Sequence, residues 1–186
     1  MKGLDADLRA LQEVRDLVAF GTKAAVKAVA GYGQADVDRL CAAMADAGAK
    51  AAPRSGARMA VQETGFGRLH YKILKNLFGS EGTWASIQHE RTVGVLSSST
   101  RTPVSPRWPR PWASWRGSSQ HEPHRRPFKA IISVKGRNGI AQPALPARRC
   151  ILQAAEVLRR AIERKRAAAG PGHLPRAADP SNPPAP

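Results

Sequence analysis

The chain has 186 residues, a mass of 20.0 kDa and a formal net charge of +16 at pH 7, from 30 Lys and Arg against 14 Asp and Glu. This length suits one domain with a hydrophobic core, and the 42% hydrophobic content excludes wholesale disorder. No apolar run approaches the roughly 18 residues that span a bilayer, the acidic N-terminus lacks a signal-peptide core, and two cysteines cannot form a disulfide scaffold. We therefore expect a cytoplasmic protein with no membrane partner.

Apolar residues recur at helical spacing in the first part of the chain. One helix is expected around residues 8–18, and a second begins near Asp36, which fits an N-cap. The apolar face of the second helix would contain Val37, Leu40, Cys41, Met44 and Ala47.

Two further helices are expected before residue 80. Pro53 fits a linker before a third helix over residues 57–64, and Gly65 and Gly67 would end that helix. Residues 68–78 repeat the helical pattern. The face expected to be buried there contains Leu69, Ile73, Leu74 and Leu77.

In the second half of the chain, some segments have a clear secondary-structure pattern and others do not. Residues 92–96 form a short β-branched run that predicts a strand, whereas 128–134 is an apolar run too short to classify by periodicity. Residues 136–139 have the composition of a turn. The clearest helix covers residues 148–166, with one apolar face that contains Ile151, Ala154, Ala155, Leu158 and Ile162.

Charge and proline divide the chain into four segments. Residues 97–127 hold six Arg and one acidic residue, six of the 15 Pro and three of the four Trp. Residues 128–166 hold ten basic and two acidic side chains, and 167–186 consist largely of Ala, Pro and Gly. We therefore predict ordered parts at 1–96 and 128–166, a disordered insert at 97–127 and a disordered tail at 167–186.

Few residues carry an obvious chemistry. His121, Glu122 and His124 surround a proline rather than following the metal-binding HExxH pattern on a helix, so a solvated loop is favoured over a metal site. The GxG fragments at 31–33 and 65–67 follow no strand, which favours helix termination over dinucleotide binding. Both cysteines, Cys41 and Cys150, lie on apolar helical faces and are expected to be buried hydrophobes rather than nucleophiles.

The insert offers the strongest signal for a macromolecular partner. Its aromatic and cationic residues alternate, which suits stacking and phosphate contacts with single-stranded nucleic acid. The residues concerned are Trp108, Trp112 and Trp115 with Arg107, Arg110 and Arg116. The alternative is that this Pro-rich segment has no fixed structure and that its charge is incidental, and composition leaves both open.

Several motifs in order resemble a known family. Residues 57–68 (ARMAVQETGFGR), 72–76 (KILKN) and 92–95 (TVGV) are similar to the A-V-E-E-T-G-x-G motif, the K-x-x-K-N element and the T-V-G-V strand of the CoA-acylating aldehyde dehydrogenases. The similarity resumes at residues 128–130 (FKA), continues through 134–140 (VKGRNGI) and reaches the helix that begins at Ala147. The resemblance covers roughly residues 30–96 and 128–166, and it is closest to the acetaldehyde or sulfoacetaldehyde branch.

The insert departs from that family. Where the family has a strand and a T-N-P-T loop, this chain has residues 103–127. Tryptophan has only one codon. In a shifted frame, each new codon combines the last base of one codon with the first two bases of the next. The junction Trp108/Pro109 must then encode Ala, and the junction Trp112/Ala113 must encode Gly. With synonymous choices elsewhere, the shifted frame can read the family stretch. We therefore hypothesise that 97–127 is translated out of frame, from a sequencing error or a decayed gene.

The resemblance implies an activity and a fold. Family members oxidise an aldehyde through a Cys thiolate, transfer hydride to NAD or NADP, and pass the acyl group to coenzyme A as homo-oligomers. It also implies that this chain is an incomplete N-terminal part of the α/β cofactor-binding domain, predominantly helical as it stands.

What this chain retains of the family's machinery is limited. The catalytic Cys and the oxyanion Asn of the family have no counterpart here, so we assign no catalytic, cofactor-binding or metal residue and expect no turnover. Binding of NAD or NADP by the fragment itself is in doubt. The alternative function is a small basic nucleic-acid-binding protein that uses the insert.

Overall fold

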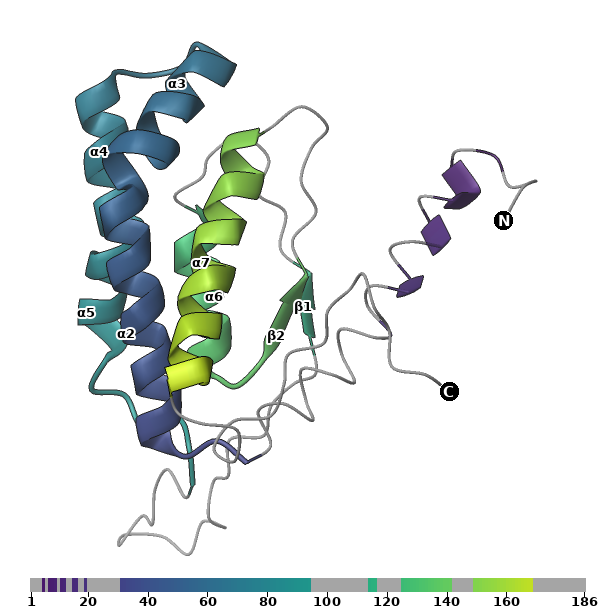
Figure 1. The fold of residues 1–186 in the computed structure, drawn as a ribbon, viewed down its shortest axis with the longest axis vertical. Helices are drawn as coiled ribbons and strands as arrows, with labels where there is room; N and C mark the ends of the chain where they lie inside the picture. The colour runs from purple at the N-terminus through teal and green to yellow at the C-terminus, as the bar shows by residue number, and fades with distance from the viewer. Residues whose placement is uncertain are drawn as a thin grey trace, which may run out of the picture.

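The computed structural model describes 31–94, 114–116, 125–141, 149–168 and a few positions before residue 20. Helices predominate in these ranges (Figure 1), as expected from the sequence. The N-terminal positions that the structure describes are helical apart from Asp5, and Leu8 and Leu11 are about half exposed. The disordered tail predicted at 167–186 and most of the insert at 97–127 lie outside the described residues.

Helix α2 (Gln34–Ala51) is the central element of the fold. It buries the apolar face that the sequence predicts except Ala47, which is half-buried. The helix begins at Gln34, before the expected N-cap at Asp36, because Gly33 is the extended residue that precedes it. Asp36 is therefore in the first turn and not at the N-cap, and its Oδ2 accepts a hydrogen bond of 3.1 Å from the Gly33 N–H.

The predicted linker at Pro53 is wrong. The chain continues from α2 into a π-helical segment, η1 (Ala52–Arg58), with Pro53 at its start, and then into α3 (Met59–Thr64). Pro53 has no N–H to donate in this continuous helical stretch, and changes of helix geometry commonly occur where proline removes an i→i−4 hydrogen bond. Gly65 ends α3 as predicted, in the left-handed region with φ of 69°.

Helix α4 (Leu69–Leu77) has its faces reversed relative to the prediction. Lys72 and Asn76 are buried, whereas Leu69 and Leu74 are exposed and Ile73 and Leu77 are half-buried. The π-helical segment η2 (Phe78–Gly82) and the short helix α5 (Thr83–Ile87) follow without a break.

The strand expected at residues 92–96 is not found in the described part, 92–94. There the N–H groups of Thr92 and Val93 donate to the side-chain oxygen of Gln34, at 2.8 and 3.1 Å, in place of a sheet partner. The unclassified run at 128–134 lies in helix α6 (Arg125–Lys135). The turn predicted at 136–139 is confirmed at Gly136 and Arg137.

One small sheet is present in the described residues. Strand β1 (Ser114–Arg116) pairs in parallel with β2 (Gly139–Ala141), with Trp115 opposite Ile140. The described residues are thus mostly helical, with a two-stranded parallel sheet.

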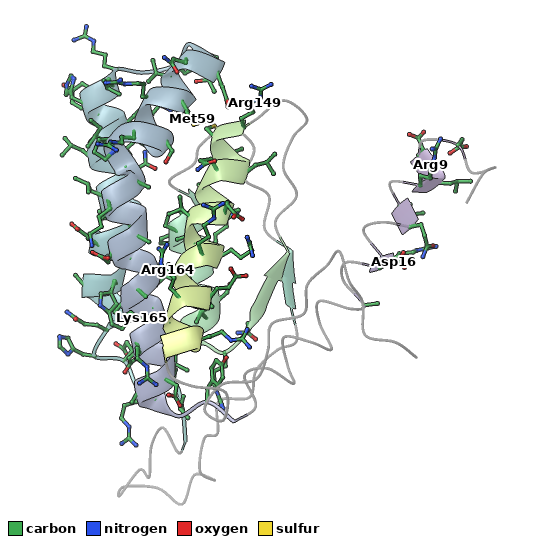
Figure 2. All side chains as sticks on the ribbon, viewed as in Figure 1. Arg9, Asp16, Met59, Arg149, Arg164 and Lys165 are labelled. Atoms are coloured by element: carbon green, nitrogen blue, oxygen red, sulfur yellow. The ribbon has the colours of Figure 1, made fainter. Side chains whose placement is uncertain are left out.

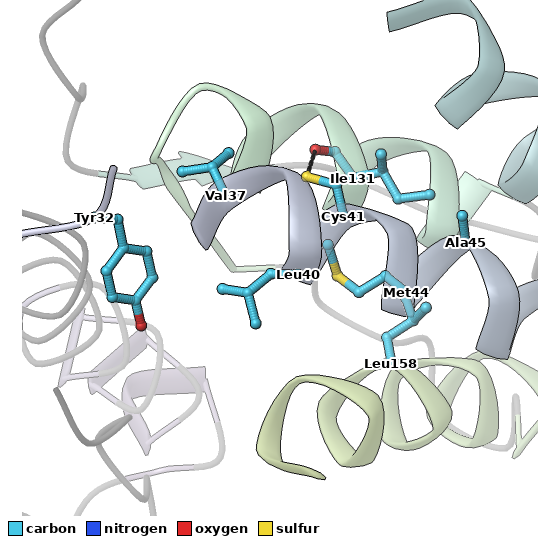
Figure 3. Close-up of a cluster of buried hydrophobic side chains, with 8 residues drawn as sticks. All are labelled: Tyr32, Val37, Leu40, Cys41, Met44, Ala45, Ile131 and Leu158. Atoms are coloured by element: carbon cyan, nitrogen blue, oxygen red, sulfur yellow. Dashed lines mark hydrogen bonds between the residues drawn. The ribbon is translucent and has the colours of Figure 1, made fainter. Parts of the chain in front are cut away.

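The core lies where α2 meets α6 and the last helix, α7 (Arg149–Ala168). The prediction of a helix at 148–166 is confirmed to within two residues. Figure 3 shows the buried side chains of α2 directed toward Ile131 of α6 and Leu158 of α7. A second small cluster joins Ala60 of α3 to Cys150 and Ile151 of α7.

Candidate functional site

Two of the sequence motifs meet where α3 reaches the start of α7. Both carboxylate oxygens of Glu63 accept a hydrogen bond from the Cys150 N–H, each at 3.1 Å. Cys150 is the second residue of α7, so its N–H has no acceptor within the helix, and the carboxylate also faces the positive end of the helix dipole. Met59 and Arg149, labelled in Figure 2, mark this junction. Glu63 is therefore a helix cap supplied by another helix.

The glycines after Glu63 have a structural role. Gly67 has a φ of 80°, and a Cβ placed there would lie 3.1 Å from Cε of Lys72. The glycine thus permits the Lys72 stem to fold across the loop. Gly65 and Gly67 follow a helix and not a strand, which confirms helix termination at 65–67. The other GxG fragment, residues 31–33, lies before α2, and the residues preceding it are outside the described part.

Asn76 of α4 packs against η1. Its side-chain amide donates to the Lys72 carbonyl at 2.7 Å, and a Cβ on Gly56 of η1 would come within 3.1 Å of the amide. Ser80 donates in turn to the Asn76 carbonyl at 2.7 Å. These contacts keep the face of α4 that contains Asn76 directed toward η1.

Lys135 is a buried cation that pairs with a carboxylate. Its Nζ lies 2.6 Å from Oδ1 of Asp38, donates to the Gln88 carbonyl at 3.1 Å and lies 5.2 Å from the centre of the Trp84 ring. No sequence pattern marks Lys135 as a functional residue, although it is the Lys of the VKGRNG stretch. This arrangement joins α2, α5 and α6 and leaves the ammonium satisfied, so it supports structure and not proton transfer.

Neither cysteine is placed as a nucleophile. Cys41 is fully buried, its Sγ lies 3.6 Å from the Ile131 carbonyl (Figure 3), and burial raises the pKa of its thiol to about 12. Cys150 is fully buried as well. The expectation that both behave as buried hydrophobes is confirmed.

The remaining candidate residues lie outside the described part. They are His121, Glu122 and His124 of the possible metal site, and Trp108 and Trp112 of the possible nucleic-acid surface. Nucleic-acid binding therefore stays a prediction. A salt-dependent affinity for single-stranded DNA that is lost on Trp108→Ala and Trp112→Ala would favour it.

Two negative findings apply to the described residues alone. They contain no group of three or more His, Cys, Asp or Glu side chains that could hold a metal ion. Within the same ranges, no helix combines the length and the apolar character needed to cross a membrane.

The described residues do not contain the fingerprint of a Rossmann-type dinucleotide site. Such a site has a glycine-rich turn between a strand and a helix, at the carboxyl edge of a parallel sheet. Here the described sheet has two short strands, and the glycine pair at 65 and 67 joins two helices. A groove of about 450 Å³ lies between α2 and α7, and its lining contains alanines of both helices and the cations Lys50, Arg164 and Lys165.

Solved structures provide the comparison. The acetylating aldehyde dehydrogenase from Geobacillus thermoglucosidasius is 34% identical over 91% of this chain, with a TM-score of 0.74. A probable aldehyde dehydrogenase from Listeria monocytogenes EGD-e is 31% identical over 87%, with a TM-score of 0.78. A propionaldehyde dehydrogenase from Clostridium phytofermentans, at 22% identity over 81% and a TM-score of 0.57, shares the fold. No protein-family model matches the sequence, and neither does any curated protein.

The fold is therefore that of part of an aldehyde dehydrogenase. The resemblance to the CoA-acylating members is confirmed, since an acetylating aldehyde dehydrogenase is 34% identical over 91% of this chain. The chain spans 37% and 36% of the Geobacillus and Listeria chains, respectively.

Proposed function

We propose that this chain is the N-terminal part of the cofactor-binding domain of an NAD(P)-dependent, CoA-acylating aldehyde dehydrogenase. The complete reaction converts an aldehyde, coenzyme A and NAD(P)⁺ into an acyl-CoA, NAD(P)H and a proton. The observation that supports this proposal best is the Geobacillus match, 34% identity and a TM-score of 0.74 over 91% of the chain. The order of the motifs along the chain supports it independently.

The chain has no turnover of its own under this proposal. Acyl transfer through a thioester needs an exposed thiol that can ionise near neutral pH. Cys41 is buried with a pKa raised to about 12, and Cys150 is buried at the start of α7. What the described residues supply is the helical scaffold: the Glu63 cap, the Lys135 ion pair and the inward side of α4.

An enzyme assay tests the absence of turnover. The purified chain is incubated with acetaldehyde or propionaldehyde, coenzyme A and NAD⁺ or NADP⁺, and reduced cofactor is followed by absorbance. We expect no rate above that of the buffer, with the Geobacillus enzyme as the positive control. A CoA-dependent rate that scales with the concentration of the chain would overturn the proposal of inactivity.

The insert at 97–127 is part of the same proposal. The two parts similar to the family flank a segment that differs from it, and the codons required by Trp108 and Trp112 fit a shifted frame. The DNA of the parent locus provides the test. We expect a shifted frame to encode the missing family stretch, and a locus in which no frame encodes it would contradict the proposal.

A further inference from the structure

The helix near the start of the chain buries almost nothing at the positions that the structure describes. Its described positions between residues 7 and 19 are helical, and all but one of them are exposed. Asp5 caps this helix, since its side chain accepts a hydrogen bond of 2.8 Å from the Leu8 N–H. Figure 2 shows Arg9 and Asp16 well away from the bundle that contains α2 and α7. We call residues 7–19 the N-terminal helix.

A helix of this length needs a surface to pack on. Isolated helices shorter than about 12–15 residues are marginal in water, because the cost of nucleation is recovered only over many hydrogen bonds. Leu8 and Leu11 share one side of the N-terminal helix and are 48% and 47% exposed, and the sequence continues the apolar spacing at Val14 and Val18. The N-terminal helix is therefore stable only if another apolar surface covers this side.

The groove between α2 and α7 has a suitable lining for such a helix. Its volume is about 450 Å³, and its apolar lining consists of small side chains: Ala43, Ala47 and Ala51 of α2, and Val157 and Ala161 of α7. Small side chains allow a helix backbone to approach closely and leave space for the larger side chains of the incoming helix. The leucines of the N-terminal helix thus complement the alanines of the groove.

The charges beside the groove match those of the N-terminal helix in one orientation. Because α2 and α7 run antiparallel (Figure 1), Arg164 and Lys165 lie toward the start of α2, and Asp46 lies further along α2. Asp7 and Arg15 are two turns apart on the leucine side of the N-terminal helix. A helix laid parallel to α2 places Asp7 beside the two cations and Arg15 beside Asp46.

Asp46 has room for a second cation. Its Oδ2 lies 2.8 Å from Nζ of Lys50, and its side chain is 61% exposed. A carboxylate has two oxygens and accepts from several donors. Arg15 can therefore join this ion pair without displacing Lys50.

The connection to α2 is long enough for this docking. Residues 20–33 separate the two helices, and 14 residues reach at most about 46 Å when fully extended. The groove runs along α2 from Ala43 to Ala51, which is about 14–26 Å from the start of that helix. A second copy of the chain is disfavoured as the source of the helix, since each copy carries a net charge of +16 and copies repel one another.

We propose that the N-terminal helix docks into the groove between α2 and α7 of its own chain, parallel to α2. The docked helix buries Leu8 and Leu11 on the alanine lining, and its Asp7 and Arg15 pair with the charges at the two ends of the contact. This inference concerns the assembly of the chain itself and does not depend on the proposed function.

Hydrogen exchange of the unmodified full chain is the first test. We expect the amides of residues 8–16 to exchange at least about tenfold more slowly than unprotected amides, because docking stabilises the helix that carries them. This measurement needs no variant. Exchange of these amides at the unprotected rate would overturn the proposal.

Disulfide trapping tests where the helix docks. Leu11→Cys combined with Ala43→Cys should form a disulfide within one chain under mild oxidation, since both native cysteines are fully buried. The matched control is Leu11→Cys with Leu152→Cys, because Leu152 of α7 is 57% exposed and does not line the groove. We expect the control pair to stay reduced. Equal trapping of both pairs, or trapping only between two copies, contradicts docking in the chain's own groove.

Charge reversal tests the orientation. Arg15→Glu should reduce the exchange protection of residues 8–16 by about threefold or more, and Asp46→Lys in the same chain should restore it. Arg9→Glu makes the same change on the opposite side of the N-terminal helix and should leave the protection unchanged. Equal effects of Arg15→Glu and Arg9→Glu, or no rescue by Asp46→Lys, would rule out the parallel arrangement proposed here.

Discussion

Burial decides the chemistry of the two cysteines. Cys41 and Cys150 are both fully buried, and the Cys41 thiol contacts a backbone carbonyl instead of a base. We predict that neither reacts with a disulfide reagent in the folded chain at about pH 8, and that both react at once in strong denaturant. A thiol titration with and without denaturant measures this. One fast-reacting thiol in the folded state would contradict the packing described for that residue.

The Cys41 thiol also makes stability depend on alkaline pH. Burial raises its pKa in the folded chain from 9.0 to about 12, so the unfolded chain loses this proton first as pH rises. The stability contribution is complete below about pH 9 and is lost progressively toward pH 12. We expect Cys41→Ala to have a smaller loss of unfolding free energy across that interval than the parent chain, measured by urea denaturation. Equal slopes would mean that the thiol does not remain protonated in the folded state.

Lys135 shows that a buried charge can be a structural residue. Its side chain is 4% exposed and its partner Asp38 is 31% exposed, so removal of the lysine leaves a carboxylate that water can partly reach. We predict that Lys135→Met costs about 2 kcal/mol of unfolding free energy, less than for a fully buried pair. Lys50→Met is the matched control, because its ion pair with Asp46 is solvent-exposed and should contribute less than about 0.5 kcal/mol. Similar losses for both variants would contradict a special role for Lys135.

At the scale of elements, periodicity predicts those helices whose apolar residues lie on a single face that packs into the core. Helices α2 and α7 were predicted because their apolar residues repeat over several turns. Helix α4 was assigned the wrong face, since periodicity identifies an apolar side but cannot tell which side the neighbours occupy. The π-helical segment η1 is not predictable, because Pro53 is also compatible with a linker and no sequence signal distinguishes the two.

The candidate site was only partly predictable for a related reason. The burial of Cys41 and Cys150 follows from their helical faces, and helix termination at Gly65 follows from its sequence context. The contacts of Glu63 and Lys135 link residues 87 and 97 positions apart, and no local pattern in the chain encodes such a distance.

Glu63 illustrates how one side chain couples two elements. Its carboxylate satisfies the Cys150 N–H at the start of α7. We predict that Glu63→Ala costs about 1–2 kcal/mol in unfolding free energy, as for loss of a helix cap at a charged end. Glu63→Gln should recover part of that loss because its amide oxygen can still accept. Gln62→Ala, at the exposed neighbouring position, should change stability by less than about 0.5 kcal/mol. A Glu63→Ala variant as stable as Gln62→Ala would rule out the cap.

For the whole molecule, the parts before and after residues 97–127 form one unit. The contacts that cross between them include Cys41 with the Ile131 carbonyl, Lys135 with Asp38, and Glu63 with the Cys150 N–H. The core in Figure 3 draws its side chains from residues 32–45, Ile131 and Leu158. The connecting segment contributes to the described structure through β1 and through residues 125–127 of α6, where Pro127 is buried beside Gly48 of α2. Outside α6 its described part is β1, and isolated two-stranded pairs add little stability.

This arrangement makes the connecting segment replaceable. We predict that exchanging residues 99–122 for a Gly/Ser sequence of equal length preserves the helical circular dichroism signal and changes the unfolding free energy by less than about 1 kcal/mol, because loop-closure entropy depends weakly on composition. Met44→Ala provides the contrast, since truncating a fully buried side chain of α2 should cost about 3 kcal/mol. Urea denaturation of both variants measures the difference. If the exchanged chain unfolds without a cooperative transition while Met44→Ala retains one, residues 99–122 hold the two parts together, and an out-of-frame origin for them becomes untenable.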